Sequence, residues 1–163
     1  MFISDIIVNA IYINIPFCLR KCSFCHYVNN LKYSYSKVED SYFIILLKQL
    51  EYVLKNIKNN KLSSIYFGGG TPSLLNEHQI NQIKELFDNY NISSEEVSIE
   101  IYPDICNFDY DNNNFFNRFS IGVQSFDDKL LKLYNRKNYD YKIIEDIIYK
   151  IKKIIITIKL ILI

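Results

Sequence analysis

Residues 10–25 have the sequence AIYINIPFCLRKCSFC, and this stretch decides the predicted fold. Its first part, Ala10–Ile15, is a short apolar run that ends at Pro16, which is typical of a buried β-strand. Cys18, Cys22 and Cys25 follow directly, spaced as CxxxCxxC. We therefore expect a strand that delivers three thiols to a loop at one end of a sheet.

The rest of the chain alternates predicted helices with predicted strands. Further strands are expected at Leu62–Phe67, Val97–Tyr102 and Phe119–Val123, with a weaker candidate at Ile154–Ile163. Helices are expected at Val38–Lys58, after a capping box that spans Asn76–Gln79, at Asp127–Tyr134 and at Asp140–Lys153. Asn107–Asn117 has no periodicity and predicts a loop or a degenerate helix. This order favours an α/β fold built on a parallel sheet.

Composition and charge limit the classes of protein that fit. With 163 residues, the chain is expected to form one domain. Nineteen Lys and Arg against eighteen Asp and Glu give a net charge of +1, which excludes nucleic-acid binding that depends on charge alone. No basic segment precedes the first apolar run, and lysines interrupt the C-terminal run Ile151–Ile163, so neither a secretory signal nor a membrane span is expected. Clustered cysteines without a signal indicate a reducing compartment, the cytoplasm or an organelle such as the mitochondrion.

The three clustered cysteines predict a metal site. Three thiolates on one tight loop can ligate three irons of a [4Fe-4S] cluster and leave the fourth iron open. A structural zinc site needs four ligands, and His26 is too close to Cys25 in sequence to share one ion with it. Buried structural cysteines are a weaker alternative, because Arg20, Lys21 and Ser23 suit an exposed loop. The spacing therefore favours an iron–sulfur cluster.

Two further blocks of sequence accompany the cysteine motif. Ile65–Ser73 reads IYFGGGTPS, and Phe119–Phe126 reads FSIGVQSF, with Leu131 and Arg136 downstream. Together with Tyr12–Cys25, these blocks resemble the radical S-adenosylmethionine (SAM) superfamily, and within it the oxygen-independent coproporphyrinogen III oxidase group, which also contains the heme chaperone. The resemblance implies the N-terminal half of a (β/α)6 partial barrel. Residues 1–163 would form a partial radical SAM core domain, as a fragment or a degenerate relative.

The same resemblance implies two cofactors and the residues that hold them. Cys18, Cys22 and Cys25 would ligate the [4Fe-4S] cluster, and eight residues would contact SAM: Tyr12, Phe24, Gly69, Gly70, Thr71, Glu100, Gln124 and Arg136. From the residues alone, other roles stay open. The glycines suit a tight turn, Glu100 a solvent-facing strand position and Arg136 a surface helix, while Tyr12 and Phe24 suit core packing.

The function implied by the resemblance is reductive cleavage of SAM to a 5′-deoxyadenosyl radical in porphyrin or heme metabolism. Its partners would be a porphyrinogen or heme and an electron donor such as a flavodoxin or ferredoxin. The alternatives are a non-catalytic heme chaperone and an inactive remnant.

Several residues depart from the pattern of the oxidases. Tyr27 stands where the oxidases have a further Cys, which favours the chaperone-like branch, and Asn138 replaces a His. An Asp expected on the fifth strand is missing, and Lys159 and Ile161 occupy that region. Cys106 stands apart from the other cysteines and is expected to be a small buried residue.

Overall fold

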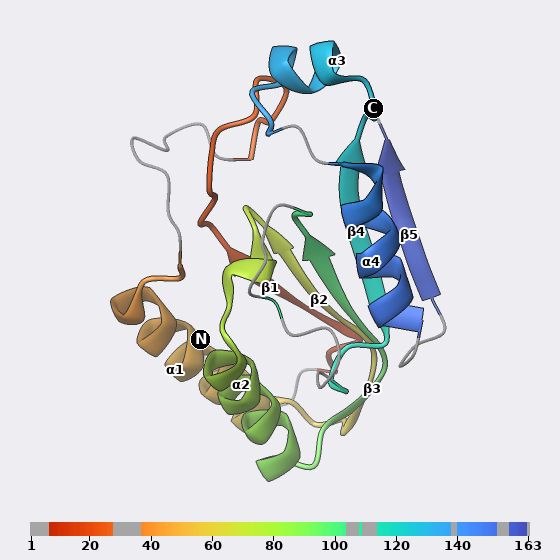
Figure 1. Ribbon diagram of the computed structural model, residues 1–163. Helices are drawn as coiled ribbons and strands as arrows, with labels where there is room; N and C mark the ends of the chain where they lie inside the picture. Colours follow the sequence, from red (N-terminus) through yellow and green to blue (C-terminus); the bar gives the residue numbers. More distant parts are fainter. Residues whose placement is uncertain are drawn as a thin grey trace.

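The structure is a computed structural model that describes residues 7–27, 37–103, 108, 114–137, 140–152 and 157–162. Among these residues, five strands form one parallel sheet in the order β1-β2-β3-β4-β5 (Figure 1). The strands are β1 (Ala10–Ile15), β2 (Lys61–Gly69), β3 (Ser93–Ile101), β4 (Arg118–Gln124) and β5 (Thr157–Leu162). The helices are α1 (Asp40–Asn56), the 3₁₀ turn η1 (Pro72–Leu74), α2 (Glu77–Asn89), α3 (Asp128–Leu133) and α4 (Tyr141–Lys152). The predicted α/β fold with a parallel sheet is confirmed.

The strand bounds differ from the prediction mainly in β3, which begins at Ser93 and not at Val97. The first four residues of this strand are polar, so a search for apolar runs does not find them. They belong to the sheet because they pair with β2, where Lys61 lies opposite Ser93. An exposed ion pair between Lys61 Nζ and Glu95 Oε1, 2.9 Å apart, lies near this start of the two strands. The weaker candidate strand is confirmed as β5, which pairs with β4.

The predicted capping box of α2 is confirmed. The Gln79 amide donates to Asn76 Oδ1 at 2.9 Å, and the Asn76 amide donates to Gln79 Oε1 at 3.1 Å. Two of the backbone groups that a helix start leaves unsatisfied therefore find partners, which stabilises such a helix by about 1 kcal/mol. Nothing in the sequence pattern predicted η1, the turn between β2 and α2.

The two faces of the sheet have opposite character. One face carries buried apolar residues that belong to a single core with the helices: Ile13, Ile15, Ile65, Phe67, Ile99, Phe119 and Ile121 from the strands, with Leu50, Ile83, Phe87 and Ile144 from the helices. Figure 1 shows α1 and α2 lying together and α4 lying along β4 and β5. The opposite face carries polar or small residues at the alternate positions, among them Tyr12 opposite Tyr66 and Glu100 opposite Ser120. This polar face is therefore available to form a site.

All five strands are parallel, so their carboxyl ends meet at one edge of the sheet. At this edge the cysteine loop, residues 16–27, follows β1. The glycine run, residues 68–70, closes β2, and Gln124 ends β4. Figure 1 shows α3 beside the loop that follows β1, although about 110 residues separate them along the chain. None of the helices within the described ranges has both the length and the apolar character needed to cross a membrane.

Candidate functional site

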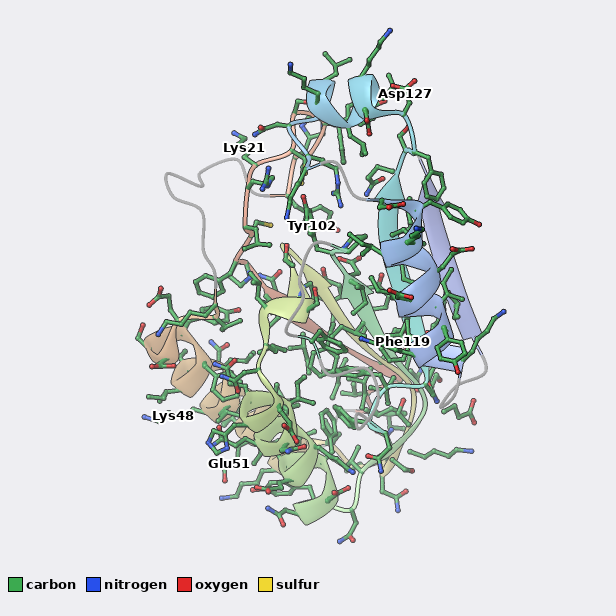
Figure 2. All side chains as sticks on the ribbon, in the orientation of Figure 1. Lys21, Lys48, Glu51, Tyr102, Phe119 and Asp127 are labelled. Carbon is green, nitrogen blue, oxygen red and sulfur yellow. The ribbon has the colours of Figure 1, made fainter. Side chains whose placement is uncertain are left out.

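The three cysteines of the loop line one cavity. Cys22 is buried, Cys18 and Cys25 are half-buried, and all three are free thiols. The turn between the last two is closed by the Cys25 amide, which donates to the Cys22 carbonyl at 3.2 Å. The cavity has a volume of about 130 Å³, and its wall also includes Phe24, Gly70, Thr71, Tyr102, Gln124 and Arg136. In Figure 2, Lys21 of the loop and Tyr102, which follows β3, lie at the same end of the sheet.

Two side chains donate hydrogen bonds to the cysteine sulfurs. Thr71 Oγ1 lies 3.3 Å from Cys18 Sγ, and Arg136 Nη1 lies 3.6 Å from Cys22 Sγ. Burial raises the pKa of the Cys18 thiol, whereas the Thr71 hydrogen bond and the Arg136 charge act to lower that pKa. Hydrogen bonds of this kind stabilise the thiolate, which is the form that ligates a metal.

A second cavity of about 270 Å³ adjoins the first along the polar face of the sheet. The two cavities share the wall residues Phe24, Gly70, Thr71, Tyr102, Gln124 and Arg136. The larger one extends to Glu100 on β3 and to Ile161 on β5. A ligand that touched the cysteine loop could therefore continue into the polar space over β3 and β4.

The structure brings six of the eight predicted SAM residues to these cavities. They are Phe24, Gly70, Thr71, Glu100, Gln124 and Arg136. Tyr12 and Gly69 do not line either cavity. Tyr12 is 52% exposed, and its ring stacks on Tyr66 with 5.8 Å between centroids. The assignment of SAM contacts remains a prediction for all eight.

Glu100 is held in the larger cavity by a neighbour that the sequence did not single out. Tyr66 donates its hydroxyl to Glu100 Oε1 at 2.8 Å. Burial raises the pKa of the Glu100 carboxyl, and hydrogen bonds from Tyr66 and the Gly69 backbone oppose that rise. Glu100 is thus a half-buried acceptor, not the solvent-facing residue that an isolated strand position would suggest. Burial, together with the Glu100 charge, also raises the pKa of Tyr12 to about 12.

Arg136 lies inside the protein and not on a surface helix. Only 7% of its surface is exposed, and its guanidinium lies 4.1 Å from the centroid of the Tyr102 ring. Its Nη2 donates to the Gly122 carbonyl at 2.7 Å. Within the described residues its Nε has no hydrogen-bond partner, and the same is true of Gln124 Oε1. Buried polar atoms without partners are costly, so this donor and this acceptor in one wall fit a polar ligand.

The glycines of the β2 motif are needed for packing. Gly69 has φ +108°, and a Cβ there would overlap Asn14 Oδ1. A Cβ at Gly70 would lie 2.6 Å from the Phe17 carbonyl oxygen and 3.0 Å from Cys18 Sγ. Gly70 therefore lets β2 lie directly against the start of the cysteine loop, in addition to any approach that it offers to a ligand.

The donor set suits an iron–sulfur cubane. In the described part of the chain, no three His, Cys, Asp or Glu residues converge closely enough to hold one metal ion. A cubane places each thiolate on a different iron, so the three sulfurs need to surround a space without meeting at a point. Cys18, Cys22 and Cys25 agree with this requirement in that all three line the smaller cavity.

The remaining candidates lie away from the cavities. His26, Tyr27 and His78 are exposed. Cys106 and Asn138 lie outside the described residues. No sequence signal assigned a supporting role to Ser23 or Asn135, which join the cysteine loop to the turn after α3. An Asn directly after a short helix is a known signal for a left-handed turn and could have drawn attention to position 135.

Comparison with known proteins places the chain in a family. The sequence pattern of the Radical SAM superfamily matches residues 12–163. The chain is 40% identical over 133 residues to the heme chaperone HemW of Buchnera aphidicola subsp. Schizaphis graminum, covering 78% of this chain and 35% of that protein. It is 31% identical over 133 residues to the oxygen-independent coproporphyrinogen III oxidase of Escherichia coli, covering 78% of this chain and 29% of that protein.

The fold comparison agrees with the sequence comparison. The solved structure of coproporphyrinogen III oxidase from Escherichia coli, described as a radical SAM enzyme, matches with a TM-score of 0.70 and 27% identity. The match covers 94% of this chain and 37% of that one. This chain thus spans about a third of the length of the relatives that it matches. Its fold, its cysteine loop and its sequence together show that the chain belongs to the radical SAM superfamily.

Proposed function

We propose that this chain holds a [4Fe-4S] cluster on Cys18, Cys22 and Cys25 and binds SAM in the adjoining polar cavity. The observation that supports this most is the continuity of the two cavities. One wall, formed by Thr71, Gln124 and Arg136 among others, serves both the cysteine loop and the space over β3 and β4. When bound, the cluster would supply the electron for reductive cleavage of the sulfonium bond of SAM.

The residues of the chain would bind and orient the methionine and ribose groups of SAM. Arg136 Nε and Gln124 Oε1 would bind the carboxylate and the amino group, because each lacks a partner among the described residues. Glu100 would accept a hydrogen bond from a hydroxyl or amino group, held in place by Tyr66. Ile161 and Tyr102 would contribute apolar surface to the same cavity.

We further propose a tetrapyrrole, either heme or a porphyrinogen, as the second ligand, and a flavodoxin or ferredoxin as electron donor. The names of the relatives support this choice, since one is a heme chaperone and another a coproporphyrinogen III oxidase. Two observations favour the chaperone over the oxidase. The identity to the chaperone is higher, and Tyr27, which replaces the further Cys of the oxidases, is exposed beside the cysteine loop.

Anaerobic reconstitution with iron and sulfide tests the proposal. We expect about four irons per chain, a brown absorbance band, and heat release on titration with SAM. One zinc per chain, or an iron-loaded protein that does not bind SAM, would contradict it. Heme titration followed by absorbance, and an anaerobic assay for conversion of coproporphyrinogen III, would then separate the chaperone from the oxidase.

A further inference from the structure

The cysteine loop rests on the turn that follows α3. Four consecutive residues of the loop each contact this turn, which we define as residues 133–136. The Lys21 carbonyl accepts from Asn135 Nδ2 at 2.8 Å, and Cys22 Sγ accepts from Arg136 Nη1 at 3.6 Å. Ser23 donates its amide to the Tyr134 carbonyl at 3.1 Å and its hydroxyl to the Leu133 carbonyl at 3.0 Å. The Phe24 ring meets the Tyr134 ring edge-on, with 5.3 Å between centroids.

The turn is itself fixed at both ends. Asp127 caps the start of helix α3, and its carboxylate accepts from the amides of Lys129 and Leu130 at 2.8 and 3.0 Å. Leu131 anchors the helix in the core with 1% of its surface exposed. At the end of the turn, the Arg136 amide donates to the Leu131 carbonyl at 2.8 Å. A turn held in this way can support the loop that lies on it.

Asn135 has a role that few residues could fill. Its φ is +55°, a left-handed conformation that Asn and Gly adopt more easily than other residues. Gly would keep this backbone but would lose the side-chain amide that bonds to Lys21. Of these two residues, only Asn both turns the chain and holds the cysteine loop.

The loop depends on such outside support. Residues 16–27 form neither helix nor strand, so no regular hydrogen-bond ladder fixes the positions of the three cysteines. Groups that orient metal ligands from outside typically change metal affinity by about 10–100-fold when they are removed. A hydrogen bond to the backbone between Cys18 and Cys22 would act on both ligands at once.

We infer that Asn135 is a positioning residue for the cluster, because its amide fixes the cysteine loop in the geometry that iron requires. This inference rests on the proposed function in so far as it assumes that the loop binds a cluster. It adds that a residue more than 100 positions downstream, with no contact to any sulfur, determines how firmly the cluster is held.

The test uses two variants of Asn135 and a matched control in the full chain. Asn135→Gly keeps the left-handed backbone and removes the amide, and Asn135→Asp keeps the shape but presents a carboxylate to the Lys21 carbonyl. Asn91→Gly is the control, because Asn91 also follows a helix with φ +53° and lies in the turn between α2 and β3, away from the cysteine loop. The measurements are iron per chain after reconstitution, the rate of iron loss to a chelator, and the unfolding temperature of the iron-free chain.

We expect both Asn135 variants to lose iron roughly tenfold faster than the unaltered chain, with Asn91→Gly unchanged. The iron-free Asn135→Gly chain should unfold at a slightly lower temperature than the iron-free Asn91→Gly chain, because it also loses the hydrogen bond to Lys21. The Asn135→Asp chain, which keeps the side chain's size, then separates cluster positioning from general stability. Iron loss from both Asn135 variants at the unaltered rate would overturn the inference alone. An unaltered chain that takes up no iron would overturn the proposed function, and the inference with it.

Discussion

The end of β2 lies so close to the cysteine loop at Gly70 that the effect of a larger residue there on stability can be predicted. In Gly70→Ala the new Cβ would lie 2.6 Å from the Phe17 carbonyl oxygen and 2.8 Å from the Ile15 carbonyl oxygen. Both atoms belong to the backbone, so β2 and the loop must separate. Overpacking of this kind costs about 1–3 kcal/mol. Weakening the hydrogen bond from the Gly70 amide to the Ile15 carbonyl, now 2.8 Å, adds about 1 kcal/mol.

We therefore expect Gly70→Ala to lower the free energy of unfolding by about 2–4 kcal/mol, on the basis of these two costs. For a chain of this size that corresponds to a decrease in Tm of roughly 4–16 °C. Because Cys18 Sγ lies 3.0 Å from the new Cβ, iron uptake should also decrease. Urea denaturation of the iron-free chain measures the first effect, and iron per chain after anaerobic reconstitution measures the second.

Gly122→Ala is the matched control for this substitution. Its Cβ would lie 3.1 Å from Gln124 Nε2, the end of a side chain that can move, so the loss should stay below about 1 kcal/mol. Iron uptake should be unchanged, because Gly122 does not line the cavity of the cysteines. A Gly70→Ala chain with the stability and iron content of the unaltered protein would refute the reasoning.

Three further predictions concern the cluster and the polar cavity. Replacing any one of the three loop cysteines by Ala should abolish the brown chromophore, whereas Cys106→Ala should retain it; bleaching by Cys106→Ala would contradict the ligand assignment. Thr71→Val removes the hydrogen bond to Cys18 Sγ and should lower the reduction potential of the cluster, whereas Thr71→Ser should preserve the potential. A redox titration followed by electron paramagnetic resonance measures this potential. Burial raises the pKa of Glu100, so its contribution to stability is present below the unfolded pKa near 4.5 and is lost as pH rises through the folded value. Glu100→Gln should therefore make stability fall less steeply as pH rises above about 4.5 in urea titrations. An unchanged pH profile would argue against the burial of this carboxyl.

The sequence predicted most of the fold because the relevant signals are local. Apolar runs and their bounds are properties of neighbouring residues, which is why the strand at Ala10–Ile15 and the capping box at Asn76 could be identified. The polar start of β3 was missed for the same reason. Ser93 is in a strand because of its partner Lys61 on β2, and a local pattern does not contain that partner.

The site was predicted less completely than the fold. Motif spacing and resemblance pointed to the cysteines and Arg136, which the structure brings to one cavity, but the residues around Arg136 alone suggested a surface helix. Its burial depends on Tyr102, Gly122 and Cys22, which lie on three other segments. The contact of Asn135 with Lys21 spans 114 positions. The residues next to Asn135 and those next to Lys21 therefore give no sign of it.

The burial of Arg136 places a positive charge in the wall that the two cavities share. A buried guanidinium is costly unless opposite charge or hydrogen bonds compensate for the loss of water. Here the Tyr102 ring and the Gly122 carbonyl compensate in part, and no carboxylate among the described residues pairs with Arg136. The missing negative charge would come from two ligands. A thiolate-bound cluster would supply it in the smaller cavity, and a carboxylate would supply it in the larger one. A ligand that binds only the folded state stabilises the folded state. The Arg136 charge, which destabilises the ligand-free chain, would therefore stabilise the chain that holds its ligands.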